Sequence, residues 1–180
     1  MSTNTGRYKS TKKTDATIQE SGWLNCFYTP LSDFTNIQDP VLSNTPVIGE
    51  INTIGTSHVW ATGKGALSFW VKQEALDTPG KAVGAKGSKR MKWSVILVMK
   101  GDGPVIKEVV ENMLNDQGII HMQNGCESPQ YVQFGCDCSA AEVDDMEFTS
   151  GTLEDGEVAY KLTFVTYKKL FYNGSITLRA

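Results

Sequence analysis

The chain has 180 residues and a formal net charge of −3, and 40% of its residues are hydrophobic. That length suits one domain of ordinary size, and the hydrophobic content is enough for a packed core, which excludes a wholly disordered chain. The sequence has no apolar run of about 18 residues and no apolar segment behind the charges at its start. We therefore expect no membrane-spanning helix, no export signal and no membrane partner.

The charged residues are unevenly divided along the chain. Residues 1–100 contain 12 Lys and Arg against 7 Asp and Glu, whereas residues 101–180 contain 5 against 13. A protein that stacks head to tail on copies of itself would gain from this division, because a basic face would meet an acidic one. The alternative is that both kinds of charge mix on the folded surface, since halves of a sequence are not halves of a structure.

The predicted elements begin with a polar segment. Residues 1–22 are rich in Ser, Thr and Lys, which predicts an extended N-terminal arm ahead of a single domain over 23–180. The segment 22–45 mixes aromatic residues with Pro30 and Pro40, so a short strand followed by a long irregular segment is expected. Alternating or β-branched residues then predict strands over 47–54, 58–62 and 66–73.

A stretch rich in Gly and Lys follows these strands. Residues 78–91 contain few side chains that could be anchored in a core, so we expect a long loop. The segment 91–100 is the strongest strand prediction, because every second residue is apolar. The alternation places Ile96 and Val98 on one face and five apolar residues on the other: Met91, Trp93, Val95, Leu97 and Met99.

One helix is predicted over 104–117. Pro104 suits a first helical turn, and Gly118 would end the helix. Apolar residues recur at helical spacing between them, so one stripe of the helix should lie on a sheet. That stripe consists of Val105, Ile106, Val109, Val110, Met113 and Leu114.

The rest of the chain again has strand patterns. Strands are predicted over 119–123, 130–136, 142–150, 157–168 and 171–178. The pair Asp155 and Gly156 favours a tight hairpin turn between two of them. One helix among many strands predicts a mainly β fold, a β-sandwich or β-barrel with one flanking α-helix.

The sequence lacks recognisable catalytic motifs. Neither histidine stands beside a nucleophile in a known motif, and the Gly- and Lys-rich stretch lacks the phosphate-loop pattern. We therefore predict a protein that is not an enzyme and needs no cofactor. The cations of the predicted loop are not interleaved with aromatic residues for base stacking, so docking on an acidic surface is favoured over nucleic-acid binding. These cations are Lys81, Lys86, Lys89 and Arg90.

Carboxylates cluster in the predicted strand 142–150. They alternate with Val143 and Met146 so that acidic side chains are expected on both faces of the strand. Such a strand does not fit in a core, and we predict that it faces the surface or a channel. The candidates for an acidic channel wall or ring face are Asp144, Asp145 and Glu147.

Two binding functions are kept as alternatives, both on a β-sandwich. A zinc site would use His121, Cys126, Cys136 and Cys138, although their spacing fits no common zinc pattern and small buried thiols are favoured. A carbohydrate site would stack sugar on Trp60, Trp70 and Trp93.

The order of elements and several C-terminal segments resemble a known family. Residues 148–153 (FTSGTL), 160–164 (YKLTF) and 170–176 (LFYNGSI), with the arm, the long loop and the helix between strands, are similar to the tail tube proteins of long-tailed bacteriophages and the tube proteins of contractile injection systems. In that family, sheets of neighbouring copies join edge to edge into a barrel around a channel.

The resemblance implies a structural virion protein of the tail, assembled in the host cytoplasm. Its partners would be copies of itself in stacked hexameric rings and other tail proteins, and DNA would pass through the channel without sequence-specific binding. The loop 78–91 and the arm 1–22 would reach across subunit and ring boundaries. A capsid decoration protein or a tail terminator is the alternative within a virion.

Overall fold

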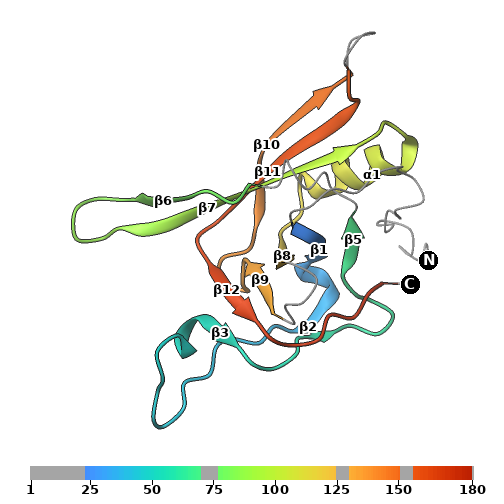
Figure 1. The fold of residues 1–180 in the computed structure, drawn as a ribbon. Helices are drawn as coiled ribbons and strands as arrows, with labels where there is room; N and C mark the ends of the chain where they lie inside the picture. The colour runs from blue at the N-terminus through green and yellow to red at the C-terminus, as the bar shows by residue number, and fades with distance from the viewer. Residues whose placement is uncertain (1–22, 70–76, 125–129, 151–155, 180) are drawn as a thin grey trace.

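The computed structural model describes residues 23–69, 77–124, 130–150 and 156–179, which form a mainly β fold with one α-helix (Figure 1). A six-stranded sheet has the order β3-β12-β9-β8-β1-β5, a four-stranded sheet has the order β10-β11-β7-β6, and β2 pairs with β4. The predicted mainly β class with one helix is confirmed. The strands are β1 (Trp23–Pro30), β2 (Phe34–Asn36), β3 (Thr53–Ile54), β4 (Val59–Trp60), β5 (Leu67–Phe69), β6 (Gly80–Val83), β7 (Arg90–Lys100), β8 (Gly118–Asn124), β9 (Tyr131–Phe134), β10 (Glu142–Thr149), β11 (Ala159–Thr166) and β12 (Lys169–Tyr172).

The two larger sheets bury one core between them. On β7, Val95, Leu97 and Met99 are buried as the alternation predicted, and they pack in one cluster with side chains from β1, β5, β8, β9 and β11. Leu162 and Phe164 of β11 lie directly opposite Leu97 and Val95 and face the same core. Burial of this shared apolar surface is the main stabilising contribution to the fold.

Strand β1 is longer and more central than the sequence predicted. It spans eight residues and pairs with β5 on one side and β8 on the other. Its Cys26 and Tyr28 are fully buried in the core. Local patterning underestimated it because the prolines and aromatic residues nearby favour an irregular segment, whereas two partner strands supply its backbone hydrogen bonds.

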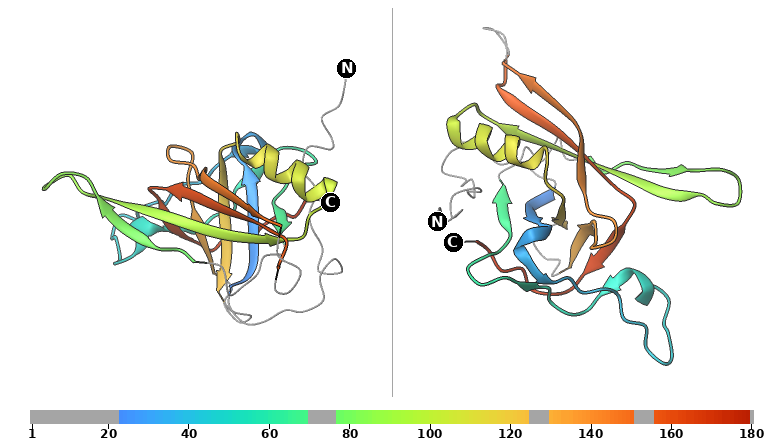
Figure 2. Two further views of the ribbon diagram at one scale, coloured as in Figure 1. Left: turned by 90° about the horizontal axis from the view of Figure 1, so that it is seen from above. Right: turned by 180° about the vertical axis from the view of Figure 1, so that it is seen from behind.

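The helix α1 (Pro104–Met113) covers one end of the sandwich (Figures 1 and 2). Its Val109, Val110 and Met113 are buried in the core, as the apolar stripe predicted. The predicted end at residue 117 is wrong, because the helix stops at Met113. Gly118 is instead the first residue of β8, where a Cβ atom would lie 2.4 Å from the ring of Tyr28.

The predicted long loop is largely a β-hairpin. Strands β6 and β7 pair across it, with Gly80 opposite Trp93 and Val83 opposite Arg90, and only residues 84–89 form the tip. Gly84 and Gly87 in the tip have positive φ, a conformation that other residues adopt at a cost. The hairpin projects from the sandwich in both views (Figures 1 and 2).

Some strand predictions extended too far. Within 47–54, a 3₁₀ turn (Glu50–Asn52) precedes the two-residue β3, and Val47 and Ile48 are exposed. Strand β12 ends at Tyr172 rather than at residue 178. The arm 1–22 and the turn at Asp155 lie outside the described residues. No helix among the described residues is long and apolar enough to cross a membrane.

A buried polar cluster joins the six-stranded sheet to the segment before β4. The backbone N–H of Gln38 donates to Nδ1 of His58 over 3.0 Å, so the proton of this neutral ring sits on Nε2. Nε2 of His58 and Nε2 of His121 lie 2.9 and 3.1 Å from Oε1 of Gln133. Both rings can donate to this one oxygen, while the Gln133 amide donates to the carbonyl of Gly135 over 2.9 Å.

Burial keeps both histidines neutral. Desolvation lowers the pKa of His121 to about 3, with a further lowering by the nearby His58. Desolvation also lowers the pKa of His58, partly offset by its hydrogen bond to Gln133. A proton added to either ring would have to enter this enclosed network, so the folded state binds protons more weakly than the unfolded chain.

We predict that Val109→Asp strongly destabilises the domain. The substitution puts an unpaired carboxylate in the core, which costs about 3–5 kcal/mol of unfolding free energy. Val105→Asp is the matched control, because Val105 lies on the same helix and is exposed. Urea unfolding of the two variants measures the difference, and equal midpoints would mean that α1 does not depend on its buried stripe.

We also predict that unfolding free energy falls as the pH is lowered from about 6.5. The unfolded histidines bind protons near that pH, whereas the pKa values of folded His58 and His121 are lower, so acid favours the unfolded chain. Each histidine contributes at most about 1.4 kcal/mol per pH unit. Urea unfolding between pH 7 and 5 measures the slope. His121→Leu should remove one histidine's share, and an unchanged slope would contradict this assignment.

Candidate functional site

The outer strands of the four-stranded sheet carry opposite charges. Strand β10 forms one edge with Glu142, Asp144, Asp145 and Glu147, and β6 with its hairpin forms the other edge. In the described part of the chain, β10 pairs along its length with β11 alone, and β6 with β7 alone. The remaining edge of each strand therefore offers free backbone N–H and C=O groups to another strand.

A β-bulge sorts the side chains of β10 onto two faces. The register shifts between Val143 and Asp145, so that Val143 lies opposite Phe164 and Met146 opposite Leu162. Both apolar residues pack on the core, while Asp145 and Glu147 face away from it. The prediction of a strand acidic on both faces is wrong, because the extra residue of the bulge restores an apolar inward face.

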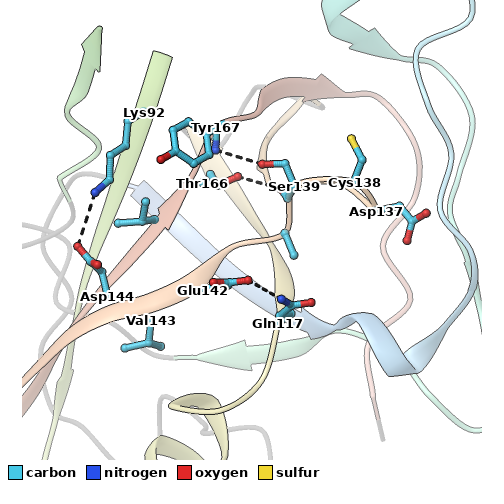
Figure 3. Close-up of a pocket in the computed structure, with 12 residues that line it drawn as sticks. Lys92, Gln117, Asp137, Cys138, Ser139, Glu142, Val143, Asp144, Thr166 and Tyr167 are labelled. Carbon is cyan, nitrogen blue, oxygen red and sulfur yellow. Dashed lines mark hydrogen bonds and ion pairs between the residues drawn. The ribbon is translucent and has the colours of Figure 1, made fainter. Parts of the chain in front are cut away.

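Two carboxylates of β10 lie close to lysines of the same sheet, one on β11 and one on β7. Glu147 accepts a hydrogen bond from Lys161 over 2.8 Å, and this bond raises the pKa of Lys161. Asp144 lies 3.8 Å from Nζ of Lys92 on β7. Both residues line a hollow of about 350 Å³, and Figure 3 shows the ion pair between them. The candidate channel face thus carries lysines among its carboxylates.

The basic edge presents small inward side chains and free cations. On β6, Gly80 and Ala82 point inward and Lys81 points outward opposite Lys92. A Cβ atom at Gly80 would lie 2.5 Å from the ring of Trp93, so the close approach requires glycine. Within the described residues, the ion pairs include none of the four predicted loop cations Lys81, Lys86, Lys89 and Arg90.

An open hollow of about 890 Å³ lies at the base of the hairpin. Its wall combines Arg90 and Lys168 with Met91, Tyr167 and Phe171, and these three apolar or aromatic side chains are 40–49% exposed. Nζ of Lys169 sits 4.5 Å from the centre of the Trp93 ring. Uncovered apolar side chains therefore lie beside the cations of the basic edge.

The acidic edge has one uncovered apolar side chain of its own. Phe148 points inward opposite Tyr160, with ring centroids 4.7 Å apart, yet it is 45% exposed. The sequence did not predict that Phe148, Met91 or Ala82 would be left uncovered. Their strand pattern looks ordinary, and only their position beyond the shared core leaves them uncovered.

The other candidate residues do not form one site. His121 is buried in the network with Gln133, and Cys126 lies outside the described residues. Cys136, the last residue of the predicted strand 130–136, lies with Cys138 in a tight turn after β9. Among the described residues, no three His, Cys, Asp or Glu side chains are grouped to hold a metal.

The candidate tryptophans are likewise separate. Trp60 packs on Phe34 and Trp93 packs on Phe134, in different sheets, and Trp70 lies outside the described residues. Trp60 and Trp93 therefore share no stacking surface among the described residues.

The fold and these edges define a two-sheet, mainly β protein with an acidic and a basic outer strand. No family model, curated protein or solved structure matches the chain.

Proposed function

We propose that the protein is a structural subunit that associates head to tail with copies of itself, the acidic strand β10 of one copy joining the basic strand β6 of the next. The observation that carries the proposal is the pair of oppositely charged strand edges on one sheet, each of which has no partner strand among the described residues. An edge of one charge repels its own kind, so contacts between two β10 edges or two β6 edges are disfavoured.

The strand directions support this mode of association. Neighbouring strands are antiparallel across the order β10-β11-β7-β6, so β10 and β6 run in opposite directions. A second copy in the same orientation would therefore place its β6 antiparallel to β10 of the first. Repetition of this contact closes into a ring or continues as a filament.

The resemblance to tail tube proteins gives the assembly its proposed form. Copies would form hexameric rings that stack into a phage tail tube, with the outward face of the four-stranded sheet lining the channel. Asp145 and Glu147 would then face DNA beside Lys161, so the channel wall would be of mixed charge and not uniformly acidic. The hairpin, which projects beyond the sandwich, would contact a neighbouring copy or ring (Figure 2).

The side chains of β6 and β10 favour one register. We infer that Gly80 to Val83 of one copy lie opposite Phe148 to Asp145 of the next. Inward, Phe148 would lie beside Gly80 and the uncovered edge of Trp93, and Met146 beside Ala82. Outward, Glu147 would lie opposite Lys81 as a cross-strand ion pair.

Shifts by two residues preserve the faces but lose contacts. One shift places Glu147 opposite Val83, which removes the ion pair with Lys81. The other shift places Glu147 opposite Pro79, which likewise removes the ion pair with Lys81. Shifts by one residue put Phe148 on the outward, charged face.

We predict that replacing Lys81, Lys86, Lys89 and Arg90 together by Gln weakens assembly without unfolding the subunit. These side chains are exposed and form no ion pair with the described residues, so their loss should affect mainly contacts between copies. The concentration needed for assembly should rise roughly 10- to 100-fold. Light scattering and negative-stain imaging measure it, with Lys107→Gln on α1 as the control. A wild-type protein that stays monomeric at all concentrations would overturn the proposed function.

Disulfide trapping between two singly substituted proteins tests the register. Lys81→Cys in one copy and Glu147→Cys in the other should give a cross-linked dimer, because directly opposite Cα atoms lie about 4.5–5.5 Å apart and a disulfide spans that distance. Cys126, Cys136 and Cys138 are first replaced by Ser, and the buried Cys26 is kept.

The controls are Asp145→Cys and Thr149→Cys, each tested against Lys81→Cys. Both point outward but lie two residues away, roughly 7–8 Å across the ladder, which is too far for an efficient link. Assembly with faster linking at a control position would refute the register and leave the head-to-tail contact standing.

A further inference from the structure

Two cysteine side chains meet in the turn that follows β9. The backbone N–H of Cys136 donates to the carbonyl of Ser139 over 3.0 Å, and the N–H of Ser139 donates back to the carbonyl of Cys136 over 3.2 Å. This closed turn places the Sγ atoms of Cys136 and Cys138 3.2 Å apart, and both thiols are free. The turn is held to the sheet, because Ser139 accepts hydrogen bonds from the Thr166 hydroxyl and the Tyr167 N–H.

The two thiols differ in their surroundings. Cys136 is 2% exposed and belongs to an apolar cluster with Ile54, Leu170 and Tyr172. Cys138 is exposed and lines both hollows, the smaller of which is shown in Figure 3. The smaller hollow is lined by one cation, Lys92, and by three carboxylates. The larger hollow is lined by three cations and by no carboxylate; its cations are Arg90, Lys168 and Lys169.

We propose that Cys136 and Cys138 form a thiol–disulfide exchange site for small anionic disulfides of the glutathione type. Cys138 is the entry thiol because solvent and a small disulfide can reach it, whereas Cys136 is covered. The three cations of the larger hollow, which has no carboxylate in its lining, favour the approach of a ligand that carries carboxylates from that side. This inference does not depend on assembly of the protein.

The reaction balances in two exchange steps. The Cys138 thiolate attacks one sulfur of glutathione disulfide, which forms a mixed disulfide and releases one glutathione thiolate. Cys136 then loses its proton to solvent, and its sulfur attacks the Cys138 sulfur and releases the second glutathione. In total, two protein thiols are oxidised to one disulfide while glutathione disulfide is reduced to two glutathione molecules.

The environment of Cys136 sets the rate of the second step. Burial is the largest cause that raises the pKa of Cys136, to about 11 while Cys138 is still a thiol, and burial persists in the mixed disulfide, where Cys138 no longer carries a proton or a charge. At neutral pH only a small fraction is thiolate, so closure of the disulfide is slow and should accelerate about tenfold per pH unit below that pKa. The mixed disulfide at Cys138 should therefore accumulate at pH 7 and disappear at pH 9.

The product should be readily reversible. The disulfide closes a loop with one residue between the cysteines, so it removes little freedom from the unfolded chain and adds little stability. The Cys138 sulfur of this disulfide is exposed, so small thiols can attack it, and exposed disulfides belong to the labile class. The site therefore suits reversible modification rather than a permanent link.

Mass spectrometry of the folded protein incubated with glutathione disulfide tests the proposal in a Cys126→Ser background. The Cys136→Ser variant should stop at one bound glutathione on Cys138. With both cysteines present, that adduct should convert to a form two hydrogens lighter than the reduced protein, with a peptide link between residues 136 and 138. Cys138→Ser should remain unmodified, and reduced glutathione should restore the thiols.

Two results would overturn the proposal. One is an adduct on Cys138 that persists equally at pH 7 and pH 9 with Cys136 present. The other is modification of the Cys138→Ser variant at the same rate as the parent. Circular dichroism of each variant confirms that the readings come from folded protein.

Discussion

Burial of the apolar rows on β7 and β11 is the constraint on which the arrangement of the molecule depends. These two strands supply the inward side chains Val95, Leu97, Leu162 and Phe164, which must meet the six-stranded sheet to leave water. They consequently occupy the middle of the four-stranded sheet, and β10 and β6 are left as its outer strands. The strands that contribute least to the core are those that carry the charge.

The two outer strands reach this arrangement in different ways. The acidic strand needs the bulge at Asp144, because without it Val143 and Met146 would point to opposite faces. The basic strand β6 instead pairs with the first residues of β7, which extend beyond the sandwich. There the small residues Gly80 and Ala82 lie opposite Trp93 and Met91 and leave both partly uncovered. Each edge thus combines charge on its outward face with unfilled apolar surface on its inward face. This combination distinguishes an edge suited to pairing from one protected by charge alone.

Two strands of the six-stranded sheet bury polar side chains, His121 on β8 and Gln133 on β9. His58, His121 and Gln133 are buried together, and both rings share Oε1 of Gln133, while Nδ1 of His121 has no hydrogen-bond partner among the described residues. The cluster is stable only while both rings are neutral. A few residues beyond Gln133, the turn from Cys136 to Ser139 places one thiol in the second apolar cluster and the other in solvent. The same end of the sheet therefore holds both groups whose chemistry changes with pH or oxidation.

Local sequence patterns predicted the buried side chains correctly in elements whose conformation does not depend on a particular partner. The alternation in 91–100 predicted which side chains of β7 share a face, of which Val95, Leu97 and Met99 are buried. The helical spacing of apolar residues in 104–117 predicted the buried face of α1. Patterns failed where a partner decides the conformation. Strand β1 depends on two neighbouring strands, and Gly118 is required by the ring of Tyr28 rather than by the end of a helix.

The sequence by itself determined the mainly β class, the helix, the basic and acidic segments and the absence of familiar catalytic motifs, because these follow from composition and short-range periodicity. Only the tertiary structure decided that the two charged segments are opposite edges of one sheet, that Phe148 is uncovered and that two thiols meet at 3.2 Å. The physical reason is that strand order, bulges and exposure arise from contacts between residues far apart in the chain, which no local pattern encodes.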